Sequence, residues 1–134
     1  MLPITLTLAA AAALINVWLA TRIVPLRYKD RVEHGDGGSR ALMIRIRSHA
    51  NFTEYTPFAL ILIGLIEMTL GSASWLWLVG LLFLAGRIAH PFGMQRPAPN
   101  ALRAGGMLVT WGVLVGLALF ALYLVYTNPG PARF

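Results

Sequence analysis

The sequence predicts an all-α integral membrane protein that crosses the bilayer four times. Of its 134 residues, 57% are hydrophobic and 12% are charged, and the mean hydropathy is +0.68. This composition is too apolar for a water-soluble domain of this size. Four apolar segments are each close to the ~20 residues that cross a bilayer as a helix. Because they use most of the chain, we expect a single domain over residues 1–134, with any site built from helix ends and short loops.

The first span is expected at about residues 2–24. Pro3 suits the first turn of a helix, and Pro25 discourages its continuation. Asn16 lies in mid-span, where we expect a hydrogen bond to another helix. The segment is long enough to cross the bilayer and has no basic residues before it, so we expect a retained helix rather than a cleaved signal. Residues 26–39 carry charges of both signs and several glycines, which predicts a flexible loop.

The second span is expected at about residues 50–70 and the third at about 75–94. Before the second span, residues 40–47 alternate cations with apolar side chains, which is typical of an interfacial turn of helix leading into the membrane. The short, uncharged turn Gly71-Ser-Ala-Ser joins the two spans. A connection of this length predicts an antiparallel helical hairpin.

The fourth span is expected at about residues 104–126 and follows a proline-rich loop over residues 91–100. It contains Gly112 and Gly116 at small-xxx-small spacing, a pattern that allows another helix to approach closely.

The basic residues are distributed by loop. The first loop has Arg27, Lys29, Arg31, Arg40, Arg45 and Arg47, and the second is flanked by Arg87, Arg96 and Arg103. By the positive-inside rule, both loops are cytoplasmic and both termini face outward. Arg133 alone opposes this orientation. The same distribution argues against nucleic-acid binding, and the absence of cysteine excludes a protein thiol nucleophile, so any thiol chemistry must use a substrate.

Polar side chains gather at the start of the second span, in Arg47-Ser-His-Ala-Asn51-Phe-Thr-Glu54-Tyr55-Thr-Pro57. At about 100° per residue, Arg47, Asn51 and Glu54 fall at about 0°, about 40° and about 340°, on one helical face. On the same scale, Tyr55 falls at about 80° and His49 at about 200°. An ionised carboxylate that faces lipid is costly, so Glu54 must face protein or water. A Glu–Arg pair between helices would explain it, but three polar groups on one face favour a ligand site.

Other polar residues leave alternatives open. Glu67 lies near the outer membrane surface, where we expect a solvated or structural carboxylate. His49 is either an interfacial residue or a contributor to the site, and His90 suits interfacial hydrogen bonding better than catalysis. No histidines are paired at metal-ligand spacing, so no metal site is expected. Arg87 and Arg103 either extend to lipid phosphates or converge into an anion site.

The spacing R-x-x-x-N-x-x-E-[YN]-x-P resembles the second helix of the MAPEG family, the membrane-associated proteins of eicosanoid and glutathione metabolism. The likeness extends to the chain length, the four spans, the basic glycine-rich first loop, Arg87-x-x-His90 and Leu102-Arg103. The resemblance implies a homotrimer of left-handed four-helix bundles. It also implies glutathione sites in the membrane at the subunit boundaries, open toward the cytoplasm.

The resemblance further implies which residues hold glutathione. The expected glutathione-binding residues are Arg27, Arg47, His49, Asn51, Glu54, Tyr55 and His90. Arg103 matches the arginine that stabilises the glutathione thiolate, which is the catalytic role. His49 stands where leukotriene C synthase has a glutamine, and His90 and Met94 stand where it has two tyrosines. This departure argues against a leukotriene synthase proper.

The activity implied is that of a membrane glutathione S-transferase or peroxidase in a bacterial inner membrane, active in detoxification. Glutathione is the co-substrate, without a metal, and the acceptor is a hydrophobic electrophile or a lipid hydroperoxide. Guanidinium groups suit the carboxylates of glutathione, and Glu54 suits its ammonium group. One alternative is a non-catalytic lipid-binding scaffold resembling 5-lipoxygenase-activating protein. A second alternative, a small transporter, lacks the support of an inverted repeat.

Overall fold

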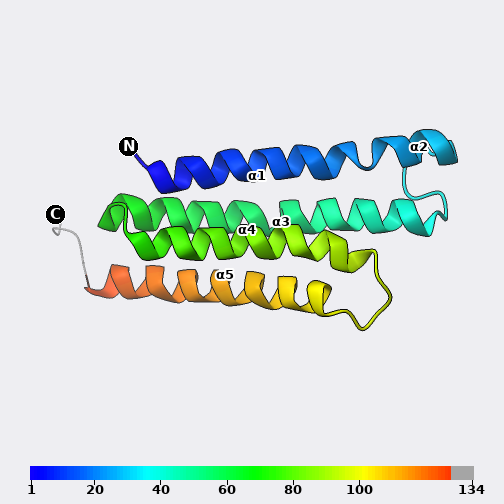
Figure 1. The fold of residues 1–134 in the computed structure, drawn as a ribbon. Helices are drawn as coiled ribbons and strands as arrows, with labels where there is room; N and C mark the ends of the chain where they lie inside the picture. The colour runs from blue at the N-terminus through cyan, green and yellow to red at the C-terminus, as the bar shows by residue number, and fades with distance from the viewer. Residues whose placement is uncertain (128–134) are drawn as a thin grey trace.

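The computed structural model describes residues 1–127, which form five helices. These are α1 (Pro3–Thr21), α2 (Val24–Asp30), α3 (Arg40–Leu70), α4 (Ser74–Met94) and α5 (Ala101–Thr127). Four helical segments are long and apolar enough to cross a membrane, the first being α1 continued by α2. Consecutive spans run antiparallel (Figure 1). The prediction of an all-α, four-span membrane bundle is confirmed.

The bundle has two chemically different ends. One end carries α2, the connection at residues 31–39, the connection at residues 95–100 and the helix termini beside them (Figure 1). We call it the basic end, because every described lysine and arginine lies at or near it. The opposite end carries the start of α1 and the short connection between α3 and α4. Arg133, which opposes the charge asymmetry, lies outside the described residues.

Several helix boundaries differ from the sequence prediction. Helix α4 runs through Pro91 to Met94, so the expected loop over residues 91–100 begins later, and α5 begins at Ala101 rather than near residue 104. The second span begins at Arg40 rather than near residue 50, because the interfacial turn runs into the span without a break and Ser39 caps it. The Ser39 hydroxyl accepts a hydrogen bond from the Leu42 amide at 3.4 Å. The prediction of a flexible loop over residues 26–39 is wrong at its start, because α2 extends to Asp30. Pro25 occupies the first turn of α2, where the missing N–H removes no helical hydrogen bond.

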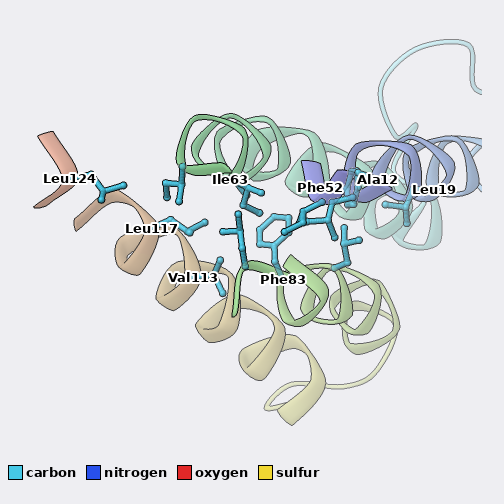
Figure 2. Packing of buried hydrophobic residues seen from close by; sticks show 14 residues of the cluster. Ala12, Leu19, Phe52, Ile63, Phe83, Val113, Leu117 and Leu124 are labelled. Atoms are coloured by element: carbon cyan, nitrogen blue, oxygen red, sulfur yellow. The ribbon is translucent and has the colours of Figure 1, made fainter. Parts of the chain in front are cut away.

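Helices α3 and α4 form the centre of the bundle. Each packs against both α1 and α5, and within residues 1–127 those two outer helices do not contact each other. Buried apolar side chains from all four spans meet along this axis (Figure 2). Large apolar side chains also cover the outside of the single chain, among them Leu14, Phe58, Leu78 and Leu119. This distribution is expected of helices that face lipid or another subunit.

Glycines of α4 and α5 allow the two helices to approach closely near the basic end. A Cβ atom added at Gly106 would lie 2.8 Å from the carbonyl oxygen of Gly86. Nothing in the described chain lies within 4 Å of a Cβ added at Gly112 or Gly116. Within one chain, this close contact is therefore made at Gly106 and not at the small-xxx-small pair of α5.

Glu67 caps α1 from the far end of α3 and is only 1% exposed. Its Oε1 accepts hydrogen bonds from the Ile4 amide at 3.0 Å and the Ser72 hydroxyl at 2.7 Å. Its Oε2 accepts from the amide and the hydroxyl of Thr5, at 2.8 and 2.7 Å. The first amides of a helix lack intrahelical partners, and a carboxylate stabilises them. The structural role predicted for Glu67 is confirmed, and its solvated alternative is wrong.

Candidate functional site

A buried arginine lies between α3, α4 and α5 near the basic end. Arg87 of α4 is 1% exposed. Its Nη1 donates to the side-chain Oδ1 of Asn51 at 2.7 Å, and its Nη2 donates to the Gly106 carbonyl at 3.4 Å. Among residues 1–127, no carboxylate lies within ion-pair distance of this guanidinium. A snorkelling role is therefore wrong for Arg87, because its charge is turned into the protein and held by neutral acceptors.

This arginine fixes the two inward residues of the α3 motif. The ring of Tyr55 lies 5.7 Å from the Arg87 Cζ atom, within the range of a cation–π contact. Because a guanidinium can only donate, the oxygen of the Asn51 amide faces it. The Asn51 Nδ2 is then directed elsewhere, and no acceptor for it is present in the described part of the chain. Asn51 is thus an oriented donor with spare hydrogen-bonding capacity.

The outward residues of the same motif form a loose ion pair. The Nη2 of Arg47 lies 4.0 Å from the Oε1 of Glu54, and their side chains are 59% and 51% exposed. The predicted helical face is therefore divided. Arg47 and Glu54 point outward. Asn51 and Tyr55, which lie at about 40° and about 80° from Arg47 around the helix, turn toward α4.

His49 lies on another side of α3 from Arg47, as the helical spacing of the two residues predicts. Its Nε2 and the Oδ1 of Asn16 are 2.9 Å apart, which joins α3 to α1. The expected interhelical hydrogen bond of Asn16 is confirmed. The same contact directs His49 toward α1, while Arg47 and Glu54 face outward.

Arg27 holds the loop that follows α2. Its Nη1 donates to three backbone carbonyls at 2.9–3.3 Å, those of Val32, Glu33 and Gly35. Arg27 is therefore engaged with its own loop, and no described contact joins it to the α3 motif.

His90 and Arg103 meet where α4 ends and α5 begins. His90 is 4% exposed, and its Nδ1–H donates to the Arg103 carbonyl at 3.3 Å. The side chain of Arg103 is exposed, and no hydrogen bond or ion pair joins its guanidinium to another residue of the described chain. The backbone of Arg103 is thus hydrogen-bonded to α4, whereas the Arg103 guanidinium has no partner in the described part of the chain.

A groove runs between α1 and α3, on the side of α3 opposite to Arg47 and Glu54. Its volume is about 310 Å³, and it is lined by Ala9, Ala12, Ala13, Asn16, Phe52, Thr53, Thr56, Pro57 and Leu60. Four of these residues alternate with the motif positions along the sequence, but helical spacing places them on the side of α3 that faces α1, away from Arg47 and Glu54. Within residues 1–127, no three His, Asp or Glu side chains are placed to hold a metal ion.

The residue that sequence reasoning missed is Arg87. We assigned it either to lipid phosphate or to an anion site, and not to the set that holds Asn51. One signal was available: Arg87 lies almost two turns inside the end of α4, among apolar residues. An arginine at that depth requires acceptors from neighbouring helices.

Comparison with known proteins agrees with this architecture. The model of the MAPEG family matches residues 5–123. "Inner membrane protein YecN" of Escherichia coli K12 is 35% identical over 116 residues, which cover 86% of this chain and 87% of the relative. The protein of the same name from Escherichia coli O6:H1 is equally similar. The chain therefore belongs to the MAPEG family and is a multi-pass integral membrane protein.

Proposed function

We propose that this chain is a membrane glutathione S-transferase, which conjugates the glutathione thiolate to hydrophobic electrophiles. The glutathione thiolate also reduces lipid hydroperoxides. The family includes glutathione transferases and non-catalytic members. The observation that carries the proposal is the α3 motif, in which Arg87 orients Asn51 while Arg47 and Glu54 remain exposed. These side chains offer a donor, a cation and an anion at one end of an apolar bundle.

The charges of the motif complement those of glutathione, which has two carboxylates and one ammonium group. Arg47 pairs with a carboxylate, Glu54 accepts from the ammonium group, and the Asn51 Nδ2 donates to a further oxygen. The exposed pair between Arg47 and Glu54 contributes little to stability at 4.0 Å. A ligand that carries both a carboxylate and an ammonium group can therefore replace the Arg47–Glu54 ion pair at a small cost in free energy.

Arg103 supplies the cation for the chemical step. A cysteine-type thiol has a pKa near 8.5, so it is mostly protonated at neutral pH, and a neighbouring cation stabilises its thiolate. The thiolate sulfur attacks an electrophilic carbon and forms a C–S bond, and the displaced electron pair departs with the leaving group. With a lipid hydroperoxide, the sulfur takes the terminal oxygen and releases the alcohol. A second glutathione then yields the disulfide and water.

The apolar acceptor reaches the thiolate from the membrane. Beyond Glu54, the face of α3 that carries Arg47 and Glu54 continues with the exposed apolar side chains of Phe58, Ile61 and Leu65. A hydrophobic electrophile dissolved in lipid has direct access to a surface of this kind.

We propose further that the active form is a homotrimer with its basic end in the cytoplasm. Arg47, Glu54 and Arg103 are open on the outside of one chain, so a second copy is needed to enclose a ligand there. Arg27, His49 and His90 contribute to binding if ligand displaces their present partners. Native mass spectrometry in detergent tests the assembly, and a purely monomeric protein with full activity would contradict it.

The deciding experiment is ultraviolet absorbance of glutathione added to the purified protein in detergent. We expect a thiolate band at neutral pH that saturates with protein, and no band with S-methylglutathione, which has no ionisable thiol. Glu54→Gln, which keeps the shape of the side chain, should weaken saturation. A parent protein with neither the band nor a glutathione-dependent rise in melting temperature would instead favour a lipid-binding scaffold.

A further inference from the structure

A second arginine at the basic end, away from the α3 motif, lies over two aromatic rings. The Cζ atom of Arg22, just after α1, lies 4.7 Å from the centre of the Trp18 ring and 5.8 Å from that of Phe92 on α4. The two rings contact each other with centroids 5.8 Å apart. Arg22 thus rests on a platform built by two helices, whereas a snorkelling side chain extends into water.

The guanidinium of Arg22 lacks an anion. Across residues 1–127, no acceptor forms a hydrogen bond with it and no carboxylate pairs with it. Arg45 of α3 is a second cation near enough to repel it. A guanidinium has five N–H donors. Two neighbouring cations with unused donors favour an anion from outside the chain.

An apolar groove continues from this platform into the membrane. Its volume is about 290 Å³, and its lining is wholly apolar or aromatic: Leu14, Ile15, Trp18, Ile88 and Phe92. Trp18 and Phe92 belong both to this lining and to the platform under Arg22. The cation therefore stands at the mouth of the groove, at the basic end of the bundle, where we expect lipid headgroups. The volume is at the small end of ligand pockets, so it suits one acyl chain rather than a whole lipid.

We propose that this groove is a binding site for an anionic phospholipid of the membrane, with the phosphate on Arg22 near Arg45 and one acyl chain between α1 and α4. A planar guanidinium matches a phosphate by paired hydrogen bonds. A zwitterionic lipid is disfavoured, because its ammonium group would approach two cations. The site shares no residue with the α3 motif, so it does not depend on glutathione chemistry.

Fluorescence quenching tests the site in nanodiscs that contain phosphatidylglycerol or phosphatidylcholine with brominated acyl chains at equal mole fraction. The contribution of Trp18 is the difference between the parent and Trp18→Phe, which keeps an aromatic platform. We expect brominated phosphatidylglycerol to quench Trp18 more strongly than brominated phosphatidylcholine. Equal quenching in the parent would overturn the proposal, since it indicates lipid contact without headgroup selection.

A pair of charge variants separates this site from general attraction to the basic end. Arg22→Gln should lower the apparent affinity for phosphatidylglycerol by about fivefold, as expected from about 1 kcal/mol per cation at a lipid surface. Arg96→Gln removes the same charge from an exposed position at the same end and should keep the preference. Equal losses in both variants would refute a specific site. If Arg22→Gln fails to fold, the parent and Arg96→Gln still decide the question.

Discussion

The two buried charged side chains of this bundle are held by hydrogen bonds rather than by ion pairs. Glu67 accepts from amides and hydroxyls at one end, and Arg87 donates to Asn51 and Gly106 near the other. Within residues 1–127 the structure has one ion pair, and it is exposed. In lipid, an unsatisfied charge is costly. Each residue is therefore held by the groups around it, and each yields a prediction.

Glu67→Gln should destabilise the protein. The amide has one oxygen to accept and one NH₂ group that cannot, so either Ile4 or Thr5 loses the partner of its amide. An unsatisfied buried donor costs about 1–3 kcal/mol, which should appear as a lower melting temperature in detergent. Glu54→Gln is the control, because its carboxylate is exposed and loosely paired. Equal melting temperatures for parent and Glu67→Gln would refute the capping role.

Arg87→Leu should weaken glutathione binding about tenfold, or about 1.4 kcal/mol, because Asn51 loses the contact that orients its amide. Arg87→Lys keeps the charge but not the fork that reaches both α3 and α5, so an intermediate loss is expected. Calorimetric titration measures both, with Arg96→Leu as control and circular dichroism to verify folding. Unchanged affinity in folded Arg87→Leu would contradict this role.

Arg103→Leu should lower the turnover near neutral pH more than it weakens glutathione binding. Loss of a neighbouring cation raises the pKa of a bound thiol, because only the thiolate loses stabilisation. The thiolate fraction at neutral pH therefore falls, and raising the pH should restore part of the rate. A pH–rate profile checks this prediction. A profile that overlays that of the parent would remove Arg103 from the chemical step.

At the scale of helices, α4 and α5 form the most extensive contact in the bundle. Gly106 permits it, because its missing side chain leaves room for the backbone of α4 at Gly86. The same carbonyl of Gly106 accepts from Arg87. Close helix packing and the placement of the buried arginine thus depend on the same residue.

Gly106→Ala should therefore destabilise the protein by about 1–3 kcal/mol, the usual cost of overpacking. Gly112→Ala is the matched control in the same helix, since nothing in the described chain lies near its added Cβ. At Gly112, the better helix propensity of alanine should raise the free energy of unfolding by roughly 0.5–1 kcal/mol. Thermal unfolding in detergent compares the two. Marked destabilisation by Gly112→Ala would instead place that face against another copy of the chain.

At the scale of the whole molecule, charge separates the two ends. The connections at residues 31–39 and 95–100 lie at the end that carries the cations, and the connection between α3 and α4 has no charge. From the positive-inside rule, we expect the basic end, and with it the α3 motif, on the cytoplasmic side.

Cysteine labelling tests this orientation in a chain that has no cysteine of its own. His34 is exposed in the connection at residues 31–39, and Ser74 is exposed at the first residue of α4, beside the connection between α3 and α4. His34→Cys should react with an impermeant maleimide only after the membrane is opened, and Ser74→Cys should react from outside intact cells. The reverse pattern would place the motif away from cytosolic glutathione and contradict the proposed function.

Much of this architecture is local and can be predicted from the order of residues. Apolar length determines four spans, and spacing along α3 determines that Arg47 and Glu54 share a side while His49 lies on another. Asn16 in mid-span already required a partner on another helix. The motif from Arg47 to Pro57 was enough to indicate the family.

Which groups meet across the bundle depends on packing. Spacing gives the angle between residues of one helix, but it does not say which neighbour each side faces, because that follows from how four helices pack together. Only the tertiary structure therefore paired Asn16 with His49, turned Arg87 toward Asn51 and placed Glu67 over the start of α1. It also moved the close glycine contacts to Gly106 and Gly93, where the backbones of α4 and α5 converge.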